Sequence, residues 1–137
     1  MSNLKYLYVR NLYRKRDITI VSDVFEKDGK TYVKAAWAFR CNHDKFIKRE
    51  GRKLALERLN SSDPNYSTIF ETEEIKFYHI AAIILSEILV NHSTPKKYLE
   101  DIHDDLRYFT ECALNGKPTW DRVFEREQIF SEEDFDV

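Results

Sequence analysis

Glycine and proline are scarce in this sequence, each occurring three times in 137 residues. No internal repeat and no run of small or proline-rich residues interrupts the chain, so nothing marks a linker between two domains. A chain of this length can bury about two-thirds of its unfolded surface in one core. We therefore expect a single domain over residues 1–137.

Cysteine and long apolar runs are also few. The two cysteines, Cys41 and Cys112, form neither a C-x-x-C pair nor a zinc-finger spacing, so we expect reduced thiols. The longest apolar run covers residues 80–85, well below the roughly 18 residues that a membrane span needs. The N-terminus lacks the charged-then-apolar layout of a signal peptide. These absences predict a cytoplasmic protein without membrane contact.

The net charge is only −2, but the charged residues are segregated along the chain. Residues 1–58 contain 15 lysines and arginines against 7 acidic residues, whereas residues 59–137 contain 7 against 17. A basic half suggests an anionic partner such as a nucleotide, and an acidic half can pair with the basic half of a second subunit. We therefore expect a homo-oligomer, while two solvated faces of opposite sign remain the simpler interpretation.

Apolar residues alternate with period two in residues 1–41, which is the pattern of β-strands. Residues 17–25 alternate throughout, and only Ser22 interrupts their apolar row. Asp28-Gly29 supplies a tight turn into the aromatic-rich run 31–41, and residues 5–13 provide a third strand. The pattern predicts a meandering antiparallel sheet of about three strands.

The next part of the chain, residues 42–116, predicts three helices. The first covers about residues 44–60, is capped by Asn42 or Asp44, and contains Gly51, which allows the helix to approach the sheet closely. Its first turns place basic side chains along one stripe. These side chains are Lys45, Lys48, Arg49, Arg52 and Lys53.

Two further helices and an acidic tail follow. Residues 73–91 are apolar almost all round, as in a central core helix. Thr94 as N-cap and Pro95 at the first helical position open a last helix, which ends at Asn115-Gly116. The tail, residues 117–137, is acidic with scattered apolar side chains. The expected fold class is α+β, with an N-terminal antiparallel sheet packed with three C-terminal helices.

Motifs for catalysis and metal binding are missing. The sequence has no G-x-S-x-G, P-loop or G-x-G-x-x-G, and Cys41-x-His43 with Asp44 supplies at most three metal ligands. His79 lies in the most apolar predicted helix and fits a hydrogen-bonded core histidine better than a general base. We expect neither an enzyme, nor a cofactor, nor a metal site.

One stretch combines features that bind phosphorylated ligands, since an aromatic strand runs into a helix dense with lysine and arginine. A helix N-terminus offers free N–H groups to a phosphate, arginine grips it with two N–H groups, and aromatic rings stack a base. Core aromatics beside a solvated helix face would give the same pattern, so both interpretations stay open. The candidate ligand-binding residues are Trp37, Phe39, Arg40, Asn42, Lys45, Arg49 and Arg52.

The same stretch resembles a pattern in small phage-encoded proteins. In these an aromatic strand, here residues 35–40, precedes F-x-x-x-x-G-R-x-x-A-x-x-R-L, here Phe46 to Leu59. With its predicted sheet followed by short helices, the chain is similar to the Thoeris anti-defence sponges, which sequester cyclic ADP-ribose signals. The resemblance implies a non-enzymatic oligomer that binds cyclic nucleotide-like messengers without cleaving them. The resemblance assigns no pocket residue of that family to a position in this chain.

Three functions follow as hypotheses. The leading one is a phage anti-defence protein that sequesters a cyclic nucleotide or ADP-ribose-derived immune signal in the host cytoplasm, with Trp37 or Phe39 stacking the base. The phosphates would be held by Arg40, Lys45, Arg49 and Arg52. The alternatives are an inhibitor that binds a host defence nuclease or polymerase through its acidic half, and a nucleic-acid-binding accessory protein that uses the basic helix.

Overall fold

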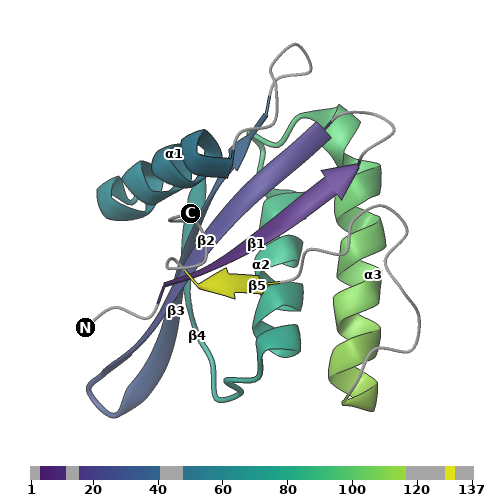
Figure 1. Ribbon diagram of the computed structural model, residues 1–137. Coiled ribbons are helices and arrows are strands. Elements are labelled where there is room, and N and C mark those ends of the chain that lie inside the picture. The colour runs from purple at the N-terminus through teal and green to yellow at the C-terminus, as the bar shows by residue number, and fades with distance from the viewer. Residues whose placement is uncertain (1–3, 12–15, 41–47, 117–128, 132–137) are drawn as a thin grey trace.

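An antiparallel β-sheet forms the middle layer of the protein, and helices lie on both of its faces (Figure 1). The computed structural model describes residues 4–11, 16–40, 48–116 and 129–131. The antiparallel sheet and the helices confirm the α+β class predicted from the sequence. Within the described ranges, every helix is too short or too polar to cross a membrane.

The three predicted strands form a meander at the centre of the sheet. They are β1 (Leu4–Asn11), β2 (Arg16–Lys27) and β3 (Lys30–Phe39), and each pairs antiparallel with the next. In the β2–β3 turn, φ is positive at both Asp28 (55°) and Gly29 (77°), as a type I′ hairpin turn requires. The predicted Asp-Gly turn is therefore confirmed.

Two further strands extend the sheet at its edges. β4 (Ser67–Glu71) pairs with β3, and β5 (Ile129–Ser131) pairs with β1, so that the order is β4-β3-β2-β1-β5. These two strands are short, and neither carries enough alternation to be recognised in the sequence. Apart from β5, the predicted acidic tail lies outside the described residues.

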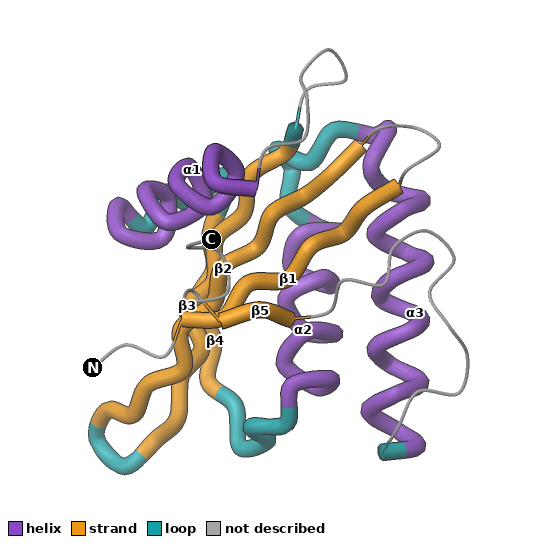
Figure 2. The backbone as a smooth tube through the Cα atoms, viewed as in Figure 1, coloured by secondary structure: helices purple, strands orange, loops and turns teal. Residues whose placement is uncertain are grey.

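Helix α1 (Lys48–Ser61) covers one face of the sheet (Figure 2). Its Ala55 and Leu59 are buried against β1, β2 and β3. Gly51 lies so close to β2 that an added Cβ would be 3.1 Å from the Cβ of Thr19 and would overlap the Thr19 hydroxyl. The close approach predicted at Gly51 is confirmed. The predicted cap residues at the start of this helix lie outside the described residues.

The other face of the sheet carries α2, a short 3₁₀ helix and α3 (Figure 1). Their bounds are Phe77–Val90, Lys96–Tyr98 and Leu99–Asn115, respectively. The larger core lies between these helices and the sheet because both partners present apolar side chains there. Its buried members include Ile18, Ile20, Trp37, Leu85, Ile88 and Phe109.

The starts of the last two helices differ from the prediction. Helix α2 begins later than residue 73, because the Thr72 hydroxyl hydrogen-bonds the backbone of Glu74 (2.9 and 3.2 Å) and holds the chain in a turn. Thr94 does not cap the last helix; its hydroxyl donates to the carbonyl of Ile88 at the end of α2 (2.6 Å). The predicted end at Gly116 is confirmed by its left-handed φ of 73°.

Candidate functional site

The two aromatic candidates, Trp37 and Phe39, lie on the face of β3 that α2 and α3 cover. Trp37 is fully buried, with 0% of its surface exposed. The Phe39 ring packs against the rings of Tyr98 and Tyr66, at centroid distances of 4.8 and 6.5 Å. Both aromatic residues therefore belong to the core, and Trp37 has no free face on which a base could stack.

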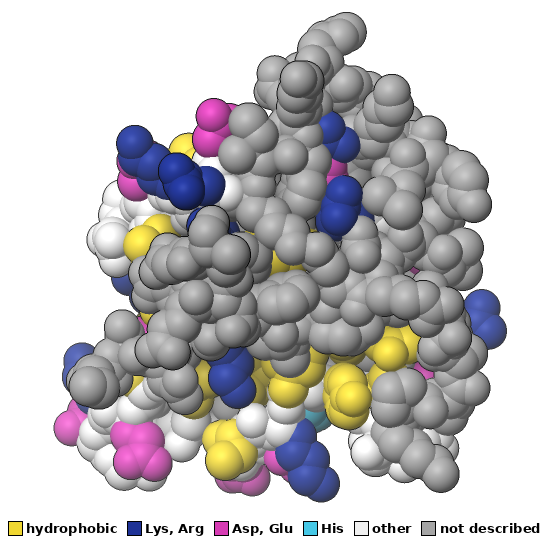
Figure 3. Space-filling view, viewed as in Figure 1, with side chains coloured by type: hydrophobic (Ala, Val, Ile, Leu, Met, Phe, Trp, Pro, Cys, Tyr) yellow, Lys and Arg dark blue, Asp and Glu magenta, His cyan; other side chains and the backbone are white. Residues whose placement is uncertain are grey.

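Two basic candidates, Arg49 and Arg52, lie on α1, across the sheet from Trp37. Arg49 is exposed, and Arg52 is half-buried with its guanidinium carbon 6.0 Å from the centre of the Tyr6 ring. In Figure 3, lysine and arginine side chains gather with acidic ones over α1. Because the sheet separates these arginines from Trp37, one ligand cannot contact both, and the predicted constellation is not a single site.

Arg40, a further candidate, is part of a buried ion cluster, which we define as Arg10, Asp17 and Arg40. The guanidinium of Arg40 contacts one carboxylate oxygen of Asp17, and Nε of Arg10 lies 3.1 Å from the other. The Asp17 side chain is 3% exposed. Burial raises the pKa of Asp17, although the charges of Arg40 and Arg10 lower it in part. The remaining candidates, Asn42 and Lys45, lie outside the described residues.

The motif that carries the phage resemblance attaches α1 to the sheet. Arg58 donates from Nη1 to the carbonyl of Trp37 at 2.9 Å, and its guanidinium carbon lies 3.7 Å from the centre of the Tyr66 ring. The glycine, alanine and leucine of the motif are among the α1 residues that pack against the sheet, as is Leu56. The described positions of the motif therefore have structural contacts that explain their residue types.

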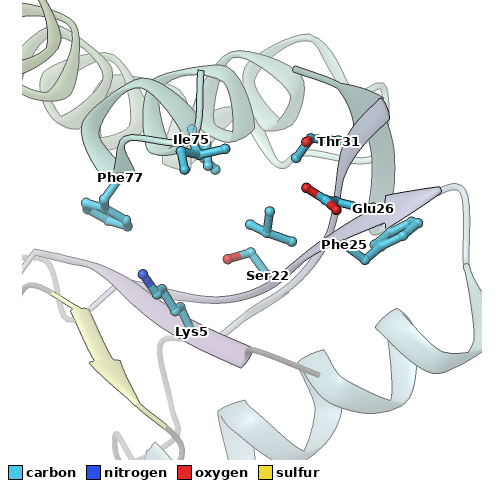
Figure 4. A pocket seen from close by; sticks show the side chains of 9 residues that line it. Lys5, Ser22, Phe25, Glu26, Thr31, Ile75 and Phe77 are labelled. Carbon is cyan, nitrogen blue, oxygen red and sulfur yellow. The ribbon is translucent and has the colours of Figure 1, made fainter. Parts of the chain in front are cut away.

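A pocket of about 540 Å³ opens beneath the start of α2, at the end of β1 and β2 opposite the buried ion cluster (Figure 4). Its floor is the sheet, and its roof is formed by Ile75, Phe77 and Ile80. The volume is typical of sites that hold small molecules. None of the residues that line the pocket is among the candidates predicted from the sequence.

Two cross-strand pairs line the floor of the pocket. Lys5 of β1 lies directly opposite Ser22 of β2, and Glu26 of β2 lies directly opposite Thr31 of β3. Since Cβ atoms of directly opposed residues are about 5 Å apart, each pair presents one charge and one hydroxyl together. We call Lys5 and Ser22 the cationic end, and Glu26 and Thr31 the anionic end. Figure 4 shows Lys5 and Glu26 on opposite sides of the cavity with Ser22 between them.

The Ser22 hydroxyl is the second polar group of the cationic end, beside Lys5. Ser22 is only 9% exposed, and within the described part of the chain its hydroxyl has no hydrogen-bond partner. The Ser22 oxygen is not among the fully buried side-chain atoms that lack a partner, so it is accessible from the pocket. An oxygen atom of a ligand in the pocket would satisfy it.

The N-terminus of α2 adds positive potential at the cationic end. Phe77 is the first residue of α2 and also lines the pocket. The N-cap residue, Lys76, makes no side-chain cap hydrogen bond, and the first turn contains no acidic residue. A Glu74 carboxylate oxygen accepts from the Lys76 N–H at 3.1 Å, but the N–H groups of the first turn itself have no partner within the helix. These N–H groups and Lys5 favour an anion together.

Three features common in catalytic sites, a buried lysine, a metal cluster and a reactive cysteine, do not occur in the described residues. Lys5 is exposed, whereas lysines that act as general bases are buried. In residues 4–11, 16–40, 48–116 and 129–131, no group of three or more His, Cys, Asp or Glu side chains could hold a metal ion. Cys112 is a buried free thiol, and burial raises its pKa, which disfavours the reactive thiolate.

Sequence reasoning missed this pocket, although one signal was present. Ser22 interrupts the apolar row of residues 17–25, and that row faces the larger core. A polar side chain on the core face of a strand needs a partner, so its position indicates either a buried hydrogen bond or a cavity. Lys5, by contrast, has no feature in the sequence that distinguishes it from an ordinary surface lysine.

Comparisons with protein-family models, with curated proteins and with solved structures found no match to this chain. The resemblance to phage anti-defence proteins stays a prediction. We therefore base the function on the geometry and chemistry of the pocket.

Proposed function

We propose that the protein binds a small, phosphorylated, nucleotide-like molecule in the pocket beneath α2 and holds it without chemical change. The observation that supports this most is the cationic end, where Lys5 and the Ser22 hydroxyl lie near the first turn of α2. An ammonium group, a hydroxyl and helix N–H groups are the donors that proteins combine to bind phosphate.

The middle of the pocket suits the flat part of such a ligand. Val24 lies between the two charged ends on β2, and Ile75 and Phe77 line the roof. An apolar slot with an aromatic wall accommodates a sugar and a base, whose faces stack on rings such as that of Phe77. In a phage protein, which the resemblance implies, such binding would withdraw a cyclic nucleotide or ADP-ribose-derived immune signal from its receptor.

Replacing Lys5 with glutamine should weaken binding of the phosphorylated ligand by at least about tenfold, because a hydrogen bond to a charged group contributes about 1.5–3 kcal/mol. The measurement is thermal unfolding with cyclic di- and trinucleotides, cyclic ADP-ribose isomers, NAD and nucleoside monophosphates. A ligand at one hundred times its Kd stabilises the folded state by about 2.7 kcal/mol, which raises the midpoint by several degrees. The Lys5→Gln variant should lose most of this rise.

The matched control is Lys53→Gln, which removes an exposed lysine from α1 and should leave the rise unchanged. The ligand should be recovered intact after the protein is denatured. The proposal is wrong if no phosphorylated compound raises the midpoint, or if Lys53→Gln removes the effect while Lys5→Gln keeps it. Recovery of a hydrolysed product would contradict binding without chemical change.

A further inference from the structure

The anionic end of the pocket lies at the far side from Lys5, where a ligand held by its phosphate would place its other end (Figure 4). The Glu26 carboxylate only accepts hydrogen bonds, and the neighbouring Thr31 hydroxyl can accept or donate. Within the described residues, neither Lys5 nor Glu26 forms an ion pair. The pocket therefore presents two opposite charges, and both are available to a ligand.

The spacing of the two ends fits one nucleotide. Ser22 and Glu26 are four residues apart on β2, which corresponds to roughly 13 Å along a strand. Figure 4 shows Lys5 and Glu26 at the two ends of the cavity. This length accommodates a phosphate, a sugar and a base in an extended arrangement.

On the basis of the proposed function, we infer that Glu26 contacts the edge of the base and selects guanine. This selection favours a guanine-containing cyclic nucleotide over an ADP-ribose-derived signal, whose base is adenine. A carboxylate has two oxygens that accept side by side, and guanine carries two adjacent donors, the ring N1–H and the 2-amino group. Adenine and cytosine place their amino group beside an acceptor nitrogen, and uracil places its single N–H between two carbonyl oxygens. These acceptors would face the carboxylate unfavourably, so the bases are discriminated by repulsion as well as by attraction.

The expected discrimination is moderate because Glu26 is exposed to solvent. A good bidentate contact with a base edge discriminates by about 1–3 kcal/mol, and a solvent-exposed one belongs at the lower end. We expect GMP to bind about tenfold more tightly than AMP. IMP lacks the 2-amino group and should fall between the two.

Replacing Glu26 with glutamine tests this assignment, because a carboxamide has one acceptor and one donor. Such an amide matches the amino group and ring nitrogen of adenine and equally the O6 and N1–H of guanine, so Glu26→Gln should remove the preference for GMP. Ribose 5-phosphate has no base, and its affinity should be the same for both proteins. The affinities of GMP, IMP, AMP and ribose 5-phosphate are measured by titration calorimetry, with Glu57→Gln on α1 as the matched control.

The outcomes separate this inference from the proposed function. A wild-type preference for GMP that Glu26→Gln removes, with Glu57→Gln unchanged, supports the inference, since a merely structural role of Glu26 would weaken all ligands alike. Equal binding of the three nucleotides to both proteins overturns the inference and leaves the phosphate site standing. Failure of all four probes to bind the wild-type protein overturns the proposed function itself.

Discussion

Replacing Asp17 with alanine is expected to lower the free energy of unfolding by about 3–5 kcal/mol, which is typical when one partner of a buried ion pair is removed. Asp17 lies between the guanidiniums of Arg10 and Arg40, whose side chains are only 18% and 16% exposed. Without the carboxylate, two positive charges would remain together in a poorly solvated place. The loss is measured by urea unfolding at pH 7.

Two variants separate charge from shape at this position. Asp17→Asn keeps the size of the side chain and one acceptor oxygen, and it should cost less than Asp17→Ala because burial favours the uncharged form of this group. Glu57→Ala on the exposed face of α1 should change stability by less than about 0.5 kcal/mol. The triple variant Arg10→Met, Asp17→Leu, Arg40→Met removes all the charges and should recover most of the loss. An Asp17→Ala protein as stable as the wild type would contradict the role of the buried ion cluster.

The pH dependence of this cluster has a definite sign. Burial raises the pKa of Asp17 above 3.8, and the charges of Arg40 and Arg10 offset this only in part. Between 3.8 and the raised pKa, the folded state binds more protons than the unfolded state, so the contribution of Asp17 is complete below 3.8 and decreases as the pH rises. The stability of the wild type relative to Asp17→Asn should therefore fall through this window and then level off. If the relative stability instead rose with pH, the charges of the two arginines would outweigh burial in setting the pKa of Asp17.

Replacing Gly51 with alanine is expected to destabilise the protein by about 1–3 kcal/mol through overpacking. The new Cβ would lie 3.1 Å from the Cβ of Thr19, which belongs to a buried strand residue and cannot move freely. Alanine has a higher helix propensity than glycine by up to about 1 kcal/mol, which opposes the loss. The new methyl group would overlap the Thr19 hydroxyl, so we expect its steric cost to exceed the gain in helix propensity.

The double variant Gly51→Ala, Thr19→Ala identifies the cause. Removing the hydroxyl relieves the closest overlap, so the two changes together should cost less than the sum of the single changes, as a double-mutant cycle of urea midpoints would measure. Additive costs would mean that α1 does not approach β2 at this position. An alanine at exposed Lys53 of α1 controls for helix propensity alone.

The central meander follows from the sequence because its signals are local. The alternation of residues 17–25 and the Asp28-Gly29 turn fix neighbouring strands without help from distant parts of the chain. β4 and β5 depend on partners far away in the sequence, and their few residues carry no pattern of their own. Their pairing is decided by tertiary structure, which local patterns do not contain.

The error in the predicted site comes from the two faces of β3. Trp37 and the basic residues of α1 are close in sequence, and this closeness favoured one shared site. In a strand, however, successive side chains point to opposite faces, and β3 is apolar on both, with Ala36 and Ala38 on one face and Val33 and Trp37 on the other. A strand that is apolar on both faces indicates a sheet covered by helices on both sides.

The hypothesis of an acidic surface that imitates nucleic acid stays a prediction. On α3, Glu100 and Asp104 are exposed, but Asp101 and Asp105 are only 5% and 9% exposed. Two of the four carboxylates near the start of α3 are therefore directed into the protein. A partner nuclease or polymerase would contact the exposed pair and the acidic residues beyond 116, all of which lie outside the described residues.

The most direct test of the pocket beneath α2 is a titration of the ¹⁵N-labelled protein with GMP, followed by the chemical shifts of the backbone amides. We expect the largest changes at Ser22, Val24 and Phe77, which surround the pocket, and small changes at Arg49 and Arg52 on the other face of the sheet. Changes confined to Arg49 and Arg52, or no change at any of these amides, would contradict binding in this pocket.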